Sequence, residues 1–308
     1  MNHMHQISLK SRAKINITLD VIGKKPNGYH DLSMIMQTVN LYDIIYIRKM
    51  HAKGIKLTTN LSWLPNDEGN IVYQAAKLFK ETCEINTGIF IELNKRIPVA
   101  AGLAGGSSNA AATLIGLNTL FETGLDQQQL LEMGVKLGAD VPYCILGGTA
   151  LAEGIGDILT PLPPMPNCYV LIAKPKINVS TASVFKSLEI SKIDKHPDNK
   201  KVIEAIKKGD IDTIASNMCN VLETVTEKKY PVIKTIKERM LKHGAQGTIM
   251  SGSGPTVFGI YHSRDQAKRT AYKLKLEYLV GDVFVTTMYN RQEGEKAYEG
   301  SILKHENR

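Results

Sequence analysis

Cysteine is scarce in this sequence and follows no pattern. The four residues, Cys83, Cys144, Cys168 and Cys219, form no C-x-x-C pair and are irregularly spaced. Zinc ribbons and disulfide frameworks both depend on regularly spaced cysteines, so neither is expected. Small buried thiols in a reducing compartment are the simplest interpretation, and we therefore expect a cytoplasmic protein.

Aromatic residues and excess charge are also limited. Phe, Trp and Tyr make up 6% of the residues, which leaves little material for stacking nucleic-acid bases. Lys and Arg number 38 against 30 Asp and Glu, which gives a net charge of +8. This modest excess suits an anionic small molecule, and we expect no nucleic-acid partner.

Long apolar runs and targeting signals are missing. No apolar stretch approaches the roughly 20 residues that a membrane span requires. The start, Met1 to Gln6, lacks a basic segment followed by an apolar run, so it does not resemble a secretory signal. We expect no membrane partner, and we interpret His3 and His5 as a loose tail and not as a metal site.

Length and proline placement predict two domains. A typical domain has roughly 150 residues, so a chain of 308 residues suggests two. Four prolines between positions 161 and 166 forbid a helix there and disfavour a central strand. We place the boundary at this extended connector, with domains at 1–162 and 163–308.

Strand and helix patterns are mixed in both halves, which predicts the α+β class. Lys14 to Val21 alternates strictly and predicts a half-buried strand, with Lys14, Asn16, Thr18 and Asp20 on its polar face. Further strands are expected at 44–48, 55–59, 89–93, 168–173, 256–261 and 283–288. Helices are expected at 70–82, 107–121, 127–137, 200–208, 211–222, 230–243 and 264–278.

The most informative segment is rich in glycine and serine and joins a predicted strand to a predicted helix. It reads Pro98-Val99-Ala100-Ala101-Gly102-Leu103-Ala104-Gly105-Gly106-Ser107-Ser108-Asn109-Ala110-Ala111. Small residues let a ligand approach the backbone closely, and the free N–H groups of a helix N-terminus attract an anion. Ser107 and Ser108 add hydroxyls that suit phosphate or a Mg²⁺ shell. A flexible loop followed by a capping serine is the alternative.

Two common phosphate motifs are absent. No G-x-x-x-x-G-K-[ST] sequence occurs, and no G-x-G-x-x-G follows a predicted strand. The glycine-rich segment is therefore neither a P-loop nor a dinucleotide fingerprint.

Two other segments stand out for small or acidic residues. Gly138-Ala139-Asp140-Val141-Pro142 puts a carboxylate just past the end of a predicted helix. Ser251-Gly252-Ser253-Gly254 forms a second small-residue loop that enters a predicted strand. Taken separately, Asp140 has the character of a turn residue, and the second loop that of a hairpin or bulge.

Together and in this order, the three segments resemble the GHMP small-molecule kinases, a family that includes galactokinase, homoserine kinase and mevalonate kinase. Pro98 to Ala111 closely matches the family's phosphate loop, and Ser251 to Gly254 its C-terminal motif. Ala104 stands where some members have glycine, and Asn109 where many have aspartate. The resemblance spans nearly the whole chain. It implies a two-domain α+β fold, with an N-terminal ribosomal-protein-S5-domain-2-like nucleotide domain and a C-terminal ferredoxin-like α/β sandwich.

Three matches point to one branch of this family. They are Ser11 to Asn16, Pro26-Asn27-Gly28-Tyr29-His30, and Gly138 to Pro142. They resemble the branch that acts on the cytidine-diphosphate derivative of methylerythritol in the non-mevalonate route to isoprenoid precursors. The resemblance implies transfer of the γ-phosphoryl group of ATP, with Mg²⁺, to the tertiary 2-hydroxyl of this small molecule. We expect a monomer or a homodimer.

The resemblance also implies roles on the acceptor side. Asp140 orients the acceptor hydroxyl or takes its proton, and Lys14 beside it keeps the carboxylate ionised. Asn16 shares the strand face of Lys14 and hydrogen-bonds the same acceptor. The implied contacts of the cytosine ring are Tyr29 on one face, His30 at the edge and Phe185 on the other face.

On the ATP side, the resemblance implies that Asn70 contacts adenine. The implied phosphate contacts are Pro98, Ala100, Ala101, Gly102, Leu103, Ala104, Gly105, Gly106, Ser107 and Ser108. Ser107 or Ser108 is expected near Mg²⁺.

Three alternatives remain open at this point. A GHMP kinase for homoserine or a mevalonate derivative is disfavoured by the Tyr29-His30 turn, because those acceptors have no base to stack. A non-catalytic nucleotide-binding paralogue is disfavoured by the presence of Lys14 and Asp140. A nucleic-acid-binding protein is disfavoured by the sparse aromatics and the modest charge.

Overall fold

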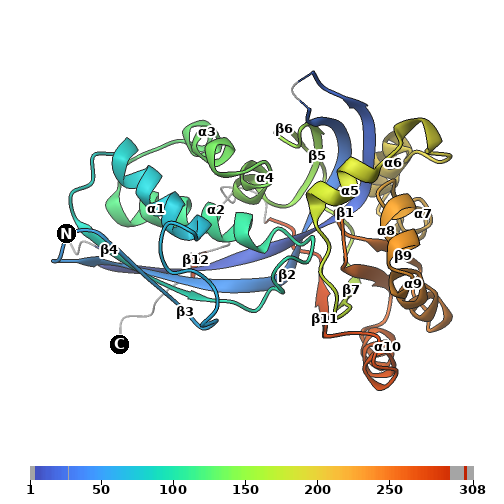
Figure 1. Cartoon of the computed structure of the whole chain (residues 1–308). Coiled ribbons are helices and arrows are strands. Elements are labelled where there is room, and N and C mark those ends of the chain that lie inside the picture. The colour runs from blue at the N-terminus through green and yellow to red at the C-terminus, as the bar shows by residue number, and fades with distance from the viewer. Residues whose placement is uncertain (1–3, 27, 292–301, 304–308) are drawn as a thin grey trace.

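The computed structural model describes residues 4–26, 28–291 and 302–303. His3 of the expected tail and Asn27 of the expected turn lie outside these residues. Figure 1 shows two sheets, each packed against helices, with the long strands of the first sheet running toward the second. Secondary structure is mixed in both halves, which confirms the α+β class.

The first sheet is built on a long antiparallel hairpin. Its strands, β1 (Gln6–Lys24) and β2 (His30–Met50), pair along nearly their whole length, with register shifts near residues 13, 17 and 22 of β1. The other strands of this eight-stranded sheet are β3 (Ile55–Thr59), β4 (Gly88–Asn94), β5 (Thr149–Gly154), β6 (Ile158–Pro161), β8 (Cys219–Asn220) and β12 (Ile302–Leu303). β8 and β12 both pair with β1, so late parts of the chain return to this first sheet.

Four helices lie on one face of this sheet (Figure 1). They are α1 (Ile71–Thr82), α2 (Gly105–Phe121), α3 (Gln127–Leu137) and α4 (Val141–Leu146). α3 begins with a capping box between Asp126 and Gln129, which satisfies two backbone N–H groups. α2 is rich in alanine and almost wholly buried, so its packing holds the segment before it in place.

The second sheet is antiparallel throughout, in the order β11-β7-β10-β9. Its strands are β7 (Tyr169–Lys174), β9 (Gly247–Met250), β10 (Val257–Tyr261) and β11 (Asp282–Thr287). The helices of this half are α5 (Thr181–Ser187), α6 (Asn199–Lys208), α7 (Ile211–Ser216), α8 (Glu223–Lys229), α9 (Val232–Lys242) and α10 (Arg264–Leu276), with a 3₁₀ turn at Ile190–Lys192.

The two faces of the second sheet pack against different partners. Val257 and Tyr261 of β10 belong to a core cluster with residues of α9 and α10. Phe258 belongs to another cluster, which includes Ile15 and Ile17 of β1. The alternation along β10 therefore joins the second sheet to the first through a shared core.

Several predicted elements are confirmed, whereas others need correction. The strand at 55–59 and the helix at 127–137 match their predicted bounds, and α2 begins two residues before the predicted start, at Gly105. The helix predicted over 211–222 is wrong, because α7 ends at Ser216 and residues 219–220 pair with β1 instead. In the described residues, no helix is both long and apolar enough to cross a bilayer.

The prediction that β1 is half-buried is also wrong. Lys14, Asn16, Thr18 and Asp20 are each less than 9% exposed. Asn199 of α6 accepts a hydrogen bond from Thr18, and His196 pairs with Asp20 at 2.7 Å, so later parts of the chain cover the polar face. Local alternation cannot reveal such a cover, because it depends on residues about 180 positions away.

We expect Phe258→Ala to lower the free energy of unfolding by about 3–5 kcal/mol, because it leaves a cavity in the core that joins the sheets. Urea denaturation followed by circular dichroism measures this change. Tyr278→Ala is the control, since Tyr278 is 87% exposed and should change stability by no more than about 0.5 kcal/mol. Equal losses for the two variants would contradict the shared core.

Candidate active site

Two small-residue loops from opposite halves of the chain meet at Gly102. A Cβ atom at Gly102 would lie 2.3 Å from the backbone oxygen of Ser251, so only glycine fits this contact. Gly102 also has a φ of 72°, in the left-handed region that glycine adopts at little cost. The hydroxyl of Ser251 donates a hydrogen bond to the oxygen of Gly102 at 2.9 Å. The structure therefore brings the predicted phosphate loop and the predicted C-terminal motif together.

The phosphate loop ends at the N-terminus of α2. Ala104 is the N-cap residue and has a left-handed φ of 53°, and its side chain makes no capping hydrogen bond. The first N–H groups of α2 thus remain free of a side-chain cap and can bind an anion. The capping-serine alternative is excluded, because alanine and not serine occupies the cap.

The two serines of the first turn have different environments. Ser108 is 3% exposed, and its hydroxyl lies 2.8 Å from that of Ser11 and donates to the oxygen of Gly105. Ser107 is half-buried, and within the described part of the chain its hydroxyl has no hydrogen-bond partner. The hydroxyl of Ser108 is thus engaged within the protein, whereas that of Ser107 is not.

Lys14 and Asp140 lie side by side next to this loop. The Nζ atom of Lys14 is 3.7 Å from Oδ2 of Asp140, and the two side chains are 6% and 36% exposed. Lys14 also donates to Oδ1 of Asn16 at 2.9 Å, which confirms that both lie on one strand face. The backbone N–H of Lys14 donates to the oxygen of Leu103, which fixes β1 beside the loop.

Asp140 occupies the N-cap position of α4, yet its side chain makes no capping bond. The carboxylate is therefore free to act on a bound molecule while Lys14 supplies a neighbouring positive charge. Cys144 lies one turn further along α4. Burial, and secondarily the charge of Asp140, raise the pKa of the Cys144 thiol far above its usual value.

The residues predicted to bind cytosine gather near the tip of the β1–β2 hairpin. Tyr29 is 60% exposed, and the ring of His30 lies 5.0 Å from the ring of Phe185 on α5 at a tilt of 33°. These two rings are in direct contact and leave no room for a base between them. Burial lowers the pKa of the His30 ring below its usual value, and the positive charge of Lys24 lowers it further. This favours the neutral ring, which offers one hydrogen-bond donor and one acceptor.

Asn70, predicted to contact adenine, lies directly before α1. It caps α1, with its side-chain oxygen accepting from the N–H of Val72 at 2.9 Å and its amide donating to the oxygen of Pro65 at 2.8 Å. The residue is 6% exposed. The structure therefore gives this amide a capping function, and a contact with adenine would require these bonds to open.

Sequence reasoning missed a buried polar network beneath the loop. Asp43, Lys95 and Asn109 are each less than 9% exposed and are joined by hydrogen bonds. Asn220 was missed as well, although its amide donates to the oxygens of Met250 and Gly252 and thereby shapes the second loop. The available signal for Asp43 was a single carboxylate within the apolar stretch Leu41 to Ile47.

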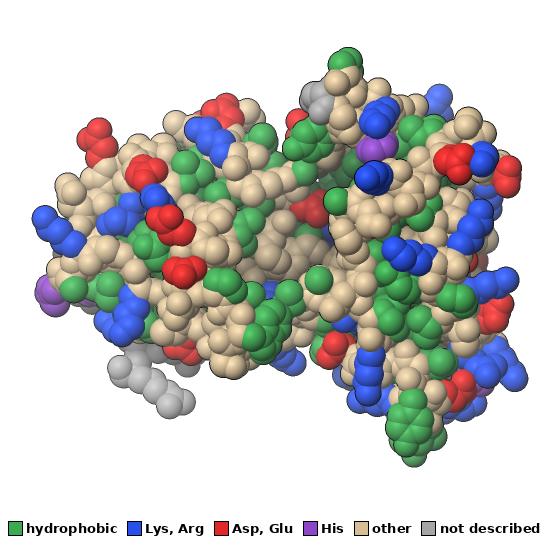
Figure 2. All heavy atoms as spheres, viewed as in Figure 1, with side chains coloured by type: hydrophobic (Ala, Val, Ile, Leu, Met, Phe, Trp, Pro, Cys, Tyr) green, Lys and Arg blue, Asp and Glu red, His purple; other side chains and the backbone are tan. Residues whose placement is uncertain are grey.

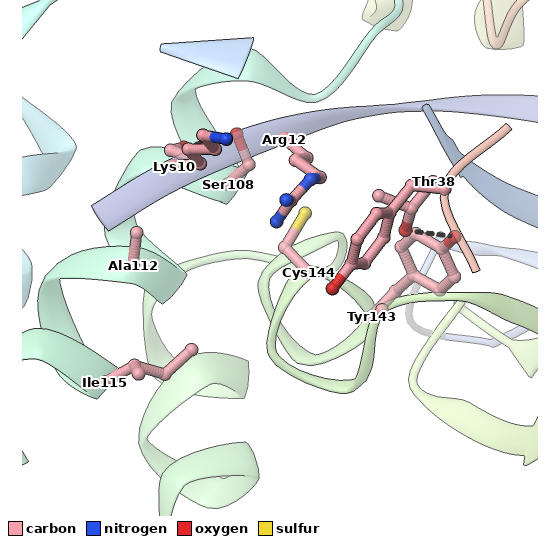
Figure 3. Close-up of a pocket in the computed structure, with 11 residues that line it drawn as sticks. Lys10, Arg12, Thr38, Ser108, Ala112, Ile115, Tyr143 and Cys144 are labelled. Carbon is pink, nitrogen blue, oxygen red and sulfur yellow. Dashed lines mark hydrogen bonds between the residues drawn. The ribbon is translucent and has the colours of Figure 1, made fainter. Parts of the chain in front are cut away.

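The surface between the two halves is hollowed, and Figure 2 shows an acidic side chain within this depression. A separate pocket lies behind Ser108, where Figure 3 shows Lys10, Arg12, Cys144, Tyr143 and Thr38 around it. Its volume of about 30 Å³ suits a water molecule and not a nucleotide. Among the described residues, no group of three or more His, Cys, Asp and Glu could hold a metal ion.

Comparison with known proteins identifies the family. Residues 70–148 match the model of the GHMP kinases N terminal domain, and residues 202–279 match that of the GHMP kinases C terminal domain. A protein of Lachnoclostridium phytofermentans, named 4-diphosphocytidyl-2-C-methyl-D-erythritol kinase, is 54% identical, and the match covers 93% of this chain and 98% of the relative. A protein of the same name from Alkaliphilus metalliredigens is 50% identical, over 94% and 99% of the two chains.

Solved structures agree with this assignment. A crystal structure of 4-(cytidine 5'-diphospho)-2C-methyl-D-erythritol kinase is 30% identical with a TM-score of 0.80, and the match covers 92% of this chain and 99% of the other. The homoserine kinase of Cytophaga hutchinsonii is 23% identical with a TM-score of 0.75, over 94% and 96% of the chains, and this likeness concerns the fold alone. The two-domain α+β fold implied by the sequence is thereby confirmed, and the chain belongs to the GHMP kinase family.

Proposed function

We propose that this protein is an enzyme that transfers the γ-phosphoryl group of ATP to the 2-hydroxyl of 4-diphosphocytidyl-2-C-methyl-D-erythritol, giving ADP and the 2-phosphate. The observation that carries the proposal is the pairing of Lys14 with Asp140 beside the junction of the two loops. The names of the relatives that match nearly the whole chain support the choice of acceptor.

The ATP phosphates bind the loop before α2. The N-terminus of α2 carries a partial positive charge and unpaired N–H groups, which suit the β- and γ-phosphates. Phosphoryl transfer depends mainly on such positioning and on neutralising the charge of the transferred group. The contact between Gly102 and Ser251 holds the loop in one conformation and so reduces the reorganisation that binding requires.

The acceptor hydroxyl lies at Asp140. This carboxylate either orients the hydroxyl or takes its proton, and both roles need it within hydrogen-bond reach of that group. Lys14, beside Asp140, then faces the oxygen of the acceptor hydroxyl and stabilises the negative charge that develops on it as the proton leaves. Asn16 accepts from Lys14 and borders the second loop, and its amide donates to the sulfur of Met34. Its proposed bond to a neighbouring oxygen of the acceptor would replace this weak contact with sulfur.

Mg²⁺ is part of the proposal. The hydroxyl of Ser107, which has no hydrogen-bond partner among the described residues, fits a cation that takes most of its ligands from phosphate and water. Such an ion supplies neutralisation of the phosphate charge. Ser107 is the residue of the phosphate loop that would hold it.

The cytidine group binds at the hairpin tip. Tyr29 offers an exposed aromatic face, and the neutral ring of His30 offers polar atoms to the base edge. Phe185 supports His30 by direct ring contact, so the base stacks outside this pair. The proposal also includes a cytoplasmic setting, a monomer or homodimer, and no nucleic-acid partner.

Release of ADP tests the acceptor directly. The enzyme is incubated with Mg²⁺-ATP and one of three acceptors: the cytidylyl methylerythritol, homoserine or mevalonate. We expect ADP only with the cytidylyl compound. Release with homoserine or mevalonate would favour a different kinase of this family, and no release with any of them would favour a non-catalytic nucleotide-binding protein.

We expect Asp140→Asn to lower kcat by about 10²- to 10⁴-fold, because the amide cannot accept the proton of the acceptor hydroxyl. The Kd for ATP, measured by calorimetry without acceptor, should stay within about threefold. Turnover at the wild-type rate would show that Asp140 has neither of the roles assigned to it.

We expect Tyr29→Ala to raise KM for the cytidylyl acceptor about tenfold or more, because stacking on an aromatic ring contributes about 1–3 kcal/mol per base. KM for ATP should not change. Tyr278→Ala removes another exposed tyrosine, far along the chain, and serves as the control. An unchanged acceptor KM for Tyr29→Ala would place the base elsewhere.

A further inference from the structure

Asp43 is a fully buried carboxylate at 0% exposure, and it lies in β2 below the phosphate loop. Its Oδ1 atom accepts hydrogen bonds from the backbone N–H groups of Arg96 and Ile97, at 2.6 and 2.8 Å. These two residues come directly before Pro98, where the loop begins. One oxygen of Asp43 therefore fixes the segment that enters the loop.

The other oxygen of Asp43 holds the segment that leaves the loop. Oδ2 accepts from the amide of Asn109 in α2 at 2.9 Å and forms an ion pair with the ammonium of Lys95. Lys95 in turn donates to Oδ1 of Asn109 at 2.9 Å, and the Asn109 amide also donates to Ser11. Asp43 thus receives four donors, three from the segment that enters the loop (Lys95, Arg96 and Ile97) and one, Asn109, from the segment that leaves it.

We propose that Asp43 is a positioning residue that clamps both ends of the phosphate loop and thereby sets the geometry in which ATP binds. This inference rests on the proposed function, since it assigns the loop to the phosphates of ATP. Asp43 itself touches no substrate, because it lies wholly beneath the loop.

The loop needs such a restraint because its backbone is strained. Ala100 and Ala104 have φ values of 52° and 53°, in the left-handed region that costs a residue with a Cβ atom about 1–2 kcal/mol. Conformations of this kind persist where the surrounding structure holds them. Ser251 holds the middle of the loop at Gly102, and Asp43 holds its two ends.

A carboxylate is the side chain that this position requires. Its two oxygens can accept all four bonds, whereas an amide has one oxygen and would turn its own N–H groups toward Lys95 and Asn109. The ammonium of Lys95 lies close beneath the start of α2, 3.1 Å from the place of a Cβ atom on Gly105. The opposite charges of Asp43 and Lys95 balance, so the network adds no net negative charge below the anion site.

The decisive variant is Asp43→Asn. It keeps an acceptor for Arg96 and Ile97 but breaks the link to Lys95 and Asn109. We expect KM for ATP, and the Kd for ATP measured by calorimetry without acceptor, to rise about tenfold or more, as for other supporting residues around a site. KM for the cytidylyl acceptor should change by no more than about twofold, because Lys14 and Asp140 are not part of the network.

Exchanging the carboxylate and the amide between positions 43 and 109 tests whether the hydrogen-bond network itself holds the loop. In Asp43→Asn combined with Asn109→Asp, the new carboxylate at position 109 can pair with Lys95 and accept from the new amide at position 43, which still binds Arg96 and Ile97. We expect this double variant to bind ATP within about threefold of the wild type, because the links among positions 43, 95 and 109 are restored with the charge moved, and the Ser11 hydroxyl can donate to the new carboxylate.

Two controls separate positioning from stability. Asp210→Asn makes the same chemical change at the N-cap of α7, and Ile236→Val weakens the core at α9 without touching the loop. Both should leave KM for ATP unchanged at temperatures below their Tm. If Asp43→Asn does not fold, Asn109→Ala removes the exit link alone and carries the same expected loss of ATP affinity.

The outcomes are distinct. Selective loss of ATP affinity in Asp43→Asn and its recovery in the double variant would support the clamp. A lowered Tm with unchanged ATP affinity, or equal losses for ATP and acceptor, would overturn it. Failure of the wild-type protein to bind ATP at all would instead overturn the proposed function.

Discussion

The contact between the backbones at Gly102 and Ser251 is the constraint on which the rest of the site depends. No side chain fits between them, and one hydroxyl hydrogen bond joins the two segments. Because these residues are 149 positions apart in sequence, the contact exists only when both halves of the chain are folded and packed together. The glycine-rich loop before α2 is therefore completed by the second half of the molecule.

Burial gives this site its electrostatic character. Lys14 and Asn16 lie under cover from both halves, whereas Asp140 keeps about a third of its side-chain surface exposed. Charges in such a setting act more strongly than they would in water, because the surrounding protein is less polarisable. The same principle explains the network at Asp43, where each buried polar group finds a partner and the charges cancel.

The elements that were predicted correctly from the sequence are determined by interactions between residues close together in the chain. The helix at 127–137 is capped by Asp126, and the predicted phosphate loop is marked by small residues that follow Pro98 directly in the chain. The prediction that failed has a distant cause. The segment at 219–220 pairs with residues 18–19 of β1, although its local pattern favours a helix. Tertiary contacts override weak local preferences in such places.

Three chemical features can be read from the sequence alone. They are small residues before a helix N-terminus, a lysine and an asparagine on one strand face, and an aspartate just past the end of a helix. Which of these groups lie together depends on the packing of the whole chain. Packing buries Ser108 against Ser11, leaves the hydroxyl of Ser107 without a partner among the described residues, and joins Asp43 to both ends of the loop. The physical reason is that these contacts join residues between 53 and 97 positions apart, and packing, not local conformational preference, selects such pairs.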